Sequence, residues 1–167
     1  MIADLRQEAL GLSVRVGLGV DAHAFEEGIP LVLGGVPFDS PRGLAGHSDG
    51  DVITHALIDA VLGAAGIGDI GSLFPSDAST PAGISSLDLL RDAVAQVHGA
   101  GYAVVNADCI LIGEQPRIAD RRGELERVLG EVVAAPVSVR ATTTDGLGFT
   151  GRGEGLAAQA VALVSSS

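Results

Sequence analysis

The sequence predicts one α/β (α+β) two-layer sandwich, in which a mixed β-sheet carries helices on one face. Three observations lead to this prediction. Apolar runs of strand length alternate with amphipathic helical patterns, no internal repeat or linker is visible, and 167 residues with 47% hydrophobic residues suffice for a single core. Because aromatic residues make up only 3% of the chain, Val, Leu, Ile and Ala must fill that core. We expect residues 14–167 to form the domain and residues 1–13 to be a short N-terminal extension.

Strands are predicted where short apolar runs are bounded by turn-forming residues. A Gly34–Gly35 pair interrupts the second run and indicates a hairpin. The predicted strands are residues 14–20, 31–38, 102–112 and 135–144.

Helices are predicted where apolar residues recur three and four positions apart and glycines follow. The predicted helices are residues 51–65, 87–101, 117–133 and 153–164, the last as a helix of small residues that closes the chain. We expect loops over residues 41–50 and 68–86, and the second is long enough to indicate function or mobility.

The composition argues against several classes of partner. The formal net charge is −11 and every basic residue is Arg, so nucleic acid and anionic membranes would be repelled. An anionic ligand would need a local device such as a metal ion or a helix N-terminus. The single Cys109 excludes an intrachain disulfide, and no apolar run reaches the length of a membrane span. The N-terminus lacks the pattern of a secretory signal, so we expect a cytoplasmic protein.

Asp21 and His23 lie two residues apart at the end of the first predicted strand, so their side chains project from the same face. Such a pair could be a metal half-site, an acid–base pair or only a polar edge. In the next helix, Asp51, His55 and Asp59 follow one stripe at four-residue intervals. Asp51 suits a helix cap, while His55 could be either a core histidine or a third ligand. Three protein ligands with one open position are typical of a catalytic zinc site.

Three loops carry further polar groups. His47–Ser48 could be a turn and a cap, or a pair that binds an oxyanion near a metal. The strand-to-helix turn at 113–118 exposes N–H groups that could bind a base edge or a phosphate. Thr142–Thr144 offer donors, and Asp145 offers an oxygen ligand suited to Mg²⁺. The glycine loop at 151–155 lacks the GK[ST] of a P-loop, so the whole set suggests phosphoryl chemistry with charge neutralised by cations.

Three long motifs stand in the chain: GVDAHAF, GLAGHSDGDVITHALIDAVLGAAGIGDIGSLFP and ATTTDGLGFTGRGEG. Together they resemble the 2-C-methyl-D-erythritol 2,4-cyclodiphosphate synthase family of non-mevalonate isoprenoid biosynthesis, from about residue 14 to the C-terminus. The resemblance implies a homotrimer with an active site at each subunit interface. It also implies a lyase whose substrate is 4-diphosphocytidyl-2-C-methyl-D-erythritol 2-phosphate. The 2-phosphate attacks the β-phosphate, CMP leaves and 2-C-methyl-D-erythritol 2,4-cyclodiphosphate forms.

The resemblance implies roles for the matching residues. One Zn²⁺ per subunit would be held by Asp21, His23 and His55, and a second cation, Mg²⁺ or Mn²⁺, by Asp145. The transition state would be stabilised by His47 and Thr143. The positions that would contact substrate, including the ribose, lid and cytidine groups, are Asp21, His23, His47, Ser48, Asp69, Ile70, Gly71, Phe74, Ser76, Asp77, Ala78, Gly113, Pro116, Arg117, Ile118, Ala119, Thr142, Thr143, Thr144, Asp145, Phe149 and Arg152.

Some positions depart from the family pattern. Asp145 replaces the more usual Glu, Gly146 stands where many members have Lys, and Ser76 and Asp77 exchange chemistry within the lid. In this family, Phe149 and Arg152 line a central cavity on the three-fold axis that is reported to accept isoprenoid diphosphates. Two rival functions stay open: a metal-dependent phosphohydrolase that gives a linear product, and a non-catalytic trimeric isoprenoid-diphosphate-binding protein.

Overall fold

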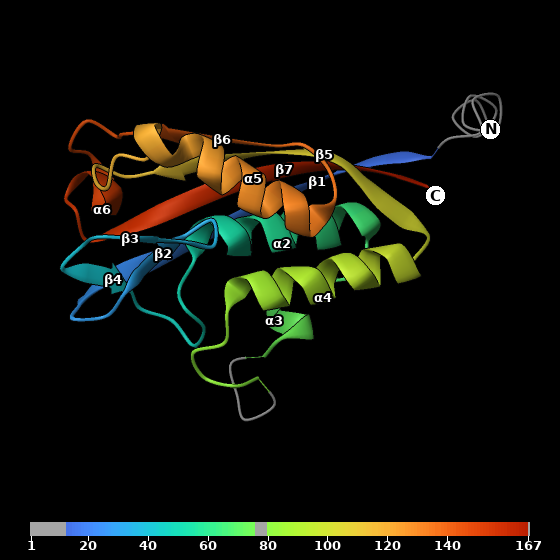
Figure 1. Cartoon of the computed structure of the whole chain (residues 1–167), viewed down its shortest axis with the longest axis horizontal. Coiled ribbons are helices and arrows are strands. Elements are labelled where there is room, and N and C mark those ends of the chain that lie inside the picture. The colour runs from blue at the N-terminus through green and yellow to red at the C-terminus, as the bar shows by residue number, and fades with distance from the viewer. Residues whose placement is uncertain (1–12, 76–79, 167) are drawn as a thin grey trace.

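The structure is a computed structural model that describes residues 13–75 and 80–166. Five strands form one sheet in the order β4–β1–β7–β5–β6, with the longer helices on one face (Figure 1). Within the sheet β5 and β6 run parallel and the other neighbours run antiparallel. This arrangement confirms the predicted mixed sheet and two-layer sandwich. The five strands are β1 (Val14–Glu27), β4 (Arg42–Leu44), β5 (Tyr102–Ile112), β6 (Val137–Thr142) and β7 (Gly155–Ser166).

The second layer consists of three longer helices, and α2 packs beneath β1 and β7 (Figure 1). They are α2 (Val52–Ala65), α4 (Ser86–Gly99) and α5 (Arg122–Val133). Short elements complete the described chain: the hairpin β2 (Leu31–Leu33) and β3 (Val36–Phe38), α3 (Ile70–Leu73), a 3₁₀ turn (Ala119–Arg121) and α6 (Gly148–Gly151). The predicted hairpin and the three internal helices are thus confirmed in type, whereas β4, α3 and α6 lie in segments that the sequence pattern left as loops.

The prediction of a C-terminal helix over residues 153–164 was wrong, because residues 155–164 belong to the central strand β7. The run is rich in Ala, and a short apolar run does not distinguish a buried helix from a buried strand. Burial alternates along it: Ala158, Ala160 and Ala162 are buried, while Gln159 and Val161 are exposed. The side chains therefore follow the two-residue period of a strand.

The prediction that Asp21 and His23 lie at a strand end was also wrong. β1 continues to Glu27, so both residues lie in its middle. The apolar run ends at Val20, but β7 still pairs with β1 as far as Ala24. The length of β1 is set by its pairing partner and not by its own hydrophobicity.

Two glycines bring α2 directly onto the backbone of β1. A methyl group at Gly19 would lie 1.8 Å from the carbonyl oxygen of Ala56, and one at Gly17 would lie 2.0 Å from that of Ala60. Side chains two apart share a face of a strand, so Asp21 and His23 continue this face toward the first turn of α2. The opposite face of β1 carries the exposed apolar side chains of Val14, Val16, Leu18 and Val20.

Asp51 begins α2 as its N-cap, as the sequence predicts. Its fully buried carboxylate accepts hydrogen bonds from the backbone N–H groups of Gly34 (2.8 Å), Gly35 (2.6 Å) and Thr54 (3.1 Å). The Thr54 hydroxyl donates a fourth, at 2.7 Å. These bonds tie the β2–β3 turn to the start of α2 and occupy the carboxylate, which leaves His55 as the residue of this stripe that can serve a metal site.

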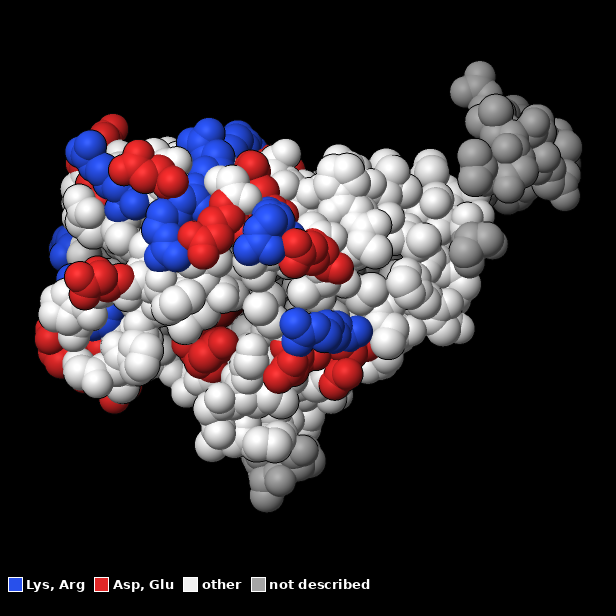
Figure 2. All heavy atoms as spheres, in the orientation of Figure 1, with Lys and Arg blue, Asp and Glu red and all other residues white. Residues whose placement is uncertain are grey.

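The outward surface of α5 carries charges of both signs, as Figure 2 shows. Arg121 pairs with Glu124, and Arg127 with Glu131, at three- and four-residue spacing. Such pairs are typical of a solvent-facing helix. No helix in the described part of the chain is both long and apolar enough to cross a bilayer.

Gly19→Ala should destabilise the fold by about 3 kcal/mol or more, because the new methyl group meets helix backbone that cannot rotate away. Gly63→Ala is the matched control: a methyl group there would meet no described atom within 4 Å, and Ala favours a helix interior over Gly by roughly 1 kcal/mol. Urea unfolding of both variants checks the prediction. Equal stability of the two variants would contradict the close contact between β1 and α2.

Candidate metal centre and active site

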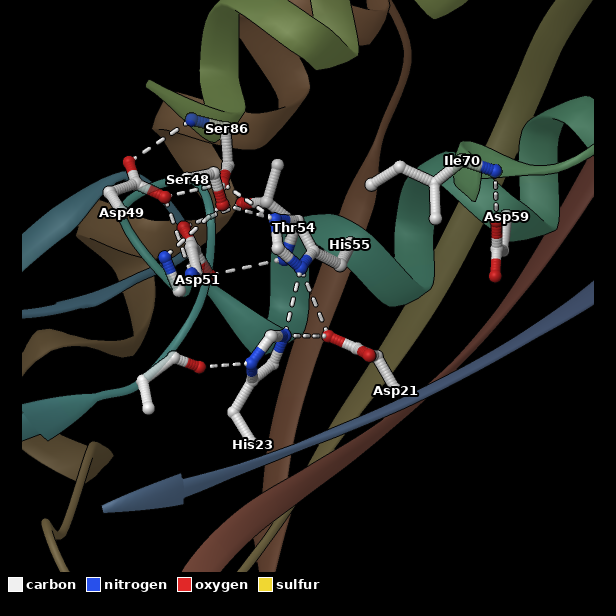
Figure 3. Close-up of polar contacts among 12 residues, drawn as sticks. Asp21, His23, Ser48, Asp49, Asp51, Thr54, His55, Asp59, Ile70 and Ser86 are labelled. Atoms are coloured by element: carbon white, nitrogen blue, oxygen red, sulfur yellow. Dashed lines mark hydrogen bonds and ion pairs between the residues drawn. The ribbon is translucent and has the colours of Figure 1, made fainter. Parts of the chain in front are cut away.

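Asp21, His23 and His55 converge on one point between β1 and α2 (Figure 3). The Asp21 Oδ2 atom lies 2.8 Å from His23 Nε2 and 3.0 Å from His55 Nδ1, and the two nitrogens lie 3.1 Å apart. The first two side chains come from neighbouring positions on the inner face of β1, and the third comes from the first turn of α2. The structure therefore brings together the three residues that the sequence analysis assigns as metal ligands.

Each histidine ring is held from its outer side. His23 Nδ1 donates a hydrogen bond to the carbonyl oxygen of Ala45 at 2.5 Å, which leaves Nε2 facing Asp21. The outer nitrogen of His55, Nε2, faces the hydroxyl oxygens of Ser48 and Ser86, both at 2.9 Å. Contacts of this kind fix the tautomer and the ring orientation of metal-binding histidines.

The electrostatics of the cluster favour positive charge. Burial opposes ionisation of Asp21, but its contacts with His23 and His55 outweigh burial and hold the pKa of Asp21 well below its ordinary value. The hydrogen bond to Asp21 outweighs burial at His23 and raises the pKa of that imidazole. The protein alone thus favours a proton on His23, and a metal ion would replace that proton.

The donor set fits a divalent metal. Two imidazole nitrogens and one carboxylate oxygen lie within 4.8 Å of one another, and zinc accepts this combination with a fourth position left open. His55 is 7% exposed, while Asp21 and His23 are partly exposed, so the centre is accessible from one side.

A cavity of about 180 Å³ opens on this side of the three ligands. Its wall includes several residues that the sequence assigns to the same site: His47, Ser48, Ile70, Gly71 and Phe74. His47 Nε2 donates a hydrogen bond to the Thr80 carbonyl oxygen at 2.6 Å, so one ring nitrogen is committed and the other is available to a ligand.

The loops after β5 and β6 form a second cavity, of about 280 Å³. It is lined by Gly113, Glu114, Gln115, Pro116, Arg117, Ala141, Thr142 and Thr143. Among the described residues, the two cavities share no lining residue. Asp145 is exposed beside the second cavity's threonines, and its Oδ1 accepts a hydrogen bond from Thr143 Oγ1 at 3.2 Å. One chain therefore carries the predicted site in two separate parts.

Other predicted positions have structural partners of their own. The Asp69 side chain caps α3 by accepting from the Ser72 N–H at 2.7 Å, and Asp59 accepts from the Ile70 N–H at 2.7 Å. Ile118 is 1% exposed, so its side chain belongs to the core, whereas Ala119 is exposed. The predicted lid residues Ser76, Asp77 and Ala78 lie outside the described residues.

Hydrogen bonds of the Thr144 side chain connect the end of the β6 loop to α6. The Thr144 hydroxyl donates to the Leu147 carbonyl oxygen at 2.6 Å and contacts the Thr150 hydroxyl at 3.0 Å. Phe149 is 42% exposed, and Arg152 is exposed and paired with Glu154 at 2.8 Å.

Sequence reasoning missed four residues around the first cavity: Thr80 and Leu89, which line it, and Asp49 and Ser86, which lie behind His55. Asp49 stands next to the His47–Ser48 pair and could have been suspected from that proximity. Ser86 is 31 residues from His55 and precedes an amphipathic helix, where a serine is ordinarily interpreted as a cap.

Comparisons with known proteins agree on one family. The YgbB family model matches residues 14–165. The 2-C-methyl-D-erythritol 2,4-cyclodiphosphate synthase of Cutibacterium acnes is 50% identical over 155 residues, which cover 92% of this chain and 92% of that protein.

Two solved structures extend this agreement to the fold. A CDP-bound form of 2C-methyl-D-erythritol-2,4-cyclodiphosphate synthase matches with a TM-score of 0.81 and 37% identity, over 90% of this chain and 99% of that one. The bifunctional IspDF from Campylobacter jejuni matches with a TM-score of 0.89 and 36% identity, over 93% of this chain but 43% of that one. The chain belongs to the YgbB family of 2-C-methyl-D-erythritol 2,4-cyclodiphosphate synthases, which confirms the predicted family and enzyme class.

Proposed function

We propose that the chain converts 4-diphosphocytidyl-2-C-methyl-D-erythritol 2-phosphate to 2-C-methyl-D-erythritol 2,4-cyclodiphosphate and CMP, and that Asp21, His23 and His55 hold the Zn²⁺ that this reaction needs. The observation that carries the proposal is the convergence of two imidazole nitrogens and one carboxylate oxygen within 4.8 Å, beside an accessible cavity. In the reaction a 2-phosphate oxygen bonds to the β-phosphorus, and the bond from that phosphorus to the bridging oxygen breaks. CMP leaves with the bonding electron pair.

The substrate is a polyanion, and a protein with a net charge of −11 repels it unless positive charge is concentrated locally. When bound, Zn²⁺ at the three ligands and Mg²⁺ or Mn²⁺ beside Asp145 supply that charge and polarise the phosphates. The protein's own groups then position the reactants. His47 and Ser48 line the first cavity and present hydrogen-bonding groups to the phosphates. Thr143, which lines the second cavity, stabilises the transition state together with His47.

The second cavity is the candidate cytidine site. It lies on the loops after β5 and β6, and the residues that line it include Gly113, Pro116, Arg117, Thr142 and Thr143. The match to a CDP-bound relative supports a cytidine nucleotide as the occupant. The proposed substrate contacts are completed by Asp69, Ile70, Gly71 and Thr144 and by the predicted lid residues Ser76, Asp77 and Ala78.

A homotrimer would unite the two cavities, with each active site built from the first cavity of one subunit and the second cavity of its neighbour. The support is the outer face of the sheet, where Val14, Val16, Leu18 and Val20 are 55–67% exposed. A row of exposed apolar side chains along one strand of a sheet is typical of a covered interface. Phe149 and Arg152, which are both exposed, would then lie near the three-fold axis and could meet an isoprenoid diphosphate.

We also propose residues 14–167 as one domain and the cytoplasm as its location. The buried apolar side chains form a single cluster within the described part of the chain. Cys109 is buried, and burial raises the pKa of its thiol to about 12, so this thiol is unreactive and suits a reducing compartment without requiring it.

His55→Ala should abolish Zn²⁺ binding and CMP release while the fold persists, because two remaining ligands are too few to hold the metal. His98→Ala is the control, since His98 lies exposed in the last turn of α4. Metal content after dialysis, CMP release and circular dichroism check the prediction. If the His55→Ala variant retained both zinc and full turnover, the three-ligand assignment would be wrong.

Leu18→Glu should convert the proposed trimer to monomers with at least tenfold lower activity, since each subunit would have to bury an unpaired carboxylate at the interface. Ala95→Glu places the same charge on an exposed position of α4 and should leave the trimer intact. Sedimentation velocity gives the oligomeric state of each variant. A monomeric wild-type protein with full activity would contradict the shared active site.

A further inference from the structure

Asp49, which is partly buried, and Ser86, which is fully buried, form a relay behind His55, on the side away from Asp21 and His23 (Figure 3). We propose that Ser86, held by Asp49, is a positioning residue that fixes the tautomer of His55 and thereby leaves the Ser48 hydroxyl free to donate to a substrate phosphate. This inference rests on the proposed zinc site and names two residues outside its ligand set.

The direction of each hydrogen bond follows from the chemistry of the groups. Ser86 offers both its backbone N–H, at 3.0 Å, and its hydroxyl to the Asp49 carboxylate. An ionised carboxylate accepts and cannot donate, so the Ser86 hydroxyl hydrogen points at Asp49. The lone pairs of Ser86 Oγ then remain for His55 Nε2, 2.9 Å away, and a lone pair there requires an N–H from the ring. His55 Nε2 is therefore the protonated nitrogen, and Nδ1 presents its lone pair to the metal position.

Ser48 competes for the same ring nitrogen, because its Oγ also lies 2.9 Å from His55 Nε2. Neutral imidazole has a single N–H, and Ser86 is the better acceptor since Asp49 polarises its hydroxyl. The Ser48 hydroxyl accepts a weaker contact from the Gly50 N–H at 3.3 Å and is not held by the carboxylate. Its hydrogen has only a long contact with Ser86 Oγ, at 3.4 Å, and can turn from that contact to a ligand.

Exposure separates the roles of the two serines. Ser86 is fully buried and is not among the described residues that line the 180 Å³ cavity. Ser48 does line that cavity. Ser86 can therefore act on the reaction through His55, whereas Ser48 can contact a bound phosphate directly.

The relay also joins two segments of the chain. Asp49 lies in the loop before α2, and Ser86 begins α4. Backbone bonds connect the same segments, from the Asp49 N–H to the Ile84 carbonyl oxygen (3.1 Å) and from the Gly83 N–H to the His47 carbonyl oxygen (2.7 Å). Because these bonds do not depend on side chains, loss of the Ser86 hydroxyl should leave the loop in place, and its effect on the metal can be measured separately.

Ser86→Ala should weaken Zn²⁺ binding by about tenfold or more, as expected for loss of a group that orients a ligating histidine. Ser85→Ala is the matched control, since within the described residues the Ser85 side chain makes no cap hydrogen bond to α4, and it should bind Zn²⁺ as the wild type does. Competition with a chromophoric chelator gives the affinities of the trimeric proteins. The absorption spectrum of Co²⁺ in the same site should change in Ser86→Ala, and the unfolding temperature without metal should stay close to that of the control.

Asp49→Asn tests the relay without removing the hydroxyl and should also weaken Zn²⁺ binding. In the Ser86→Ala/Asp49→Asn double variant the loss should be no larger than in Ser86→Ala alone, because both changes break one path to His55. Additive losses, or a Ser86→Ala variant that binds Zn²⁺ as tightly as Ser85→Ala with an unchanged Co²⁺ spectrum, would overturn the relay. Failure of the wild-type protein to bind either metal would instead overturn the zinc site itself.

Discussion

The site depends on how closely α2 approaches β1. Gly17 and Gly19 remove the side chains that would otherwise separate the helix from the strand, and the helix backbone occupies that space. The same face of β1 then presents Asp21 and His23 to the first turn of α2, where His55 Nδ1 lies 3.1 Å from His23 Nε2. A larger residue at either glycine would move the helix and separate ligands that are held by two different elements.

The resulting centre concentrates affinity for positive charge in an acidic protein. The Ala45 carbonyl oxygen contacts the outer nitrogen of one ring, the Ser86 hydroxyl contacts that of the other, and the inner nitrogens face a carboxylate whose pKa lies well below its ordinary value. Metal ions held there would neutralise the charge of a polyanionic substrate at the point of reaction and so let it approach an acidic protein. The triad cavity is separate from the cavity at the loops after β5 and β6, as expected if each active site is shared between two subunits in the way we propose.

The sequence predicts the parts of this structure that local pattern controls. The apolar period of α2, its Asp51 cap and the uninterrupted run of β5 are all visible in the residues themselves. β7 escapes prediction because its alanines satisfy both a helix and a strand, and the choice is made by pairing with β1 and β5. For the same reason β1 continues past Val20: β7, more than a hundred residues away, pairs with it as far as Ala24, and β4 pairs with Phe25–Glu27.

The site shows the same division between local and distant information. Asp21, His23 and His55 carry ligand chemistry at recognisable spacing, so the sequence pattern makes them candidates, and the family resemblance selects them among the alternatives. Ser86 and Thr80 contribute through one hydroxyl and one carbonyl group, whose importance depends on the position of a loop and a helix end. No spacing in the sequence relates them to His55 or His47.

The most direct test of the central claim is ³¹P NMR of the wild-type protein incubated with 4-diphosphocytidyl-2-C-methyl-D-erythritol 2-phosphate, Zn²⁺ and Mg²⁺. The metal centre and its positioning groups predict two coupled signals of a cyclic diphosphate together with CMP. Orthophosphate or an open-chain product would contradict the account, because water and not the 2-phosphate would then be the nucleophile that this site positions.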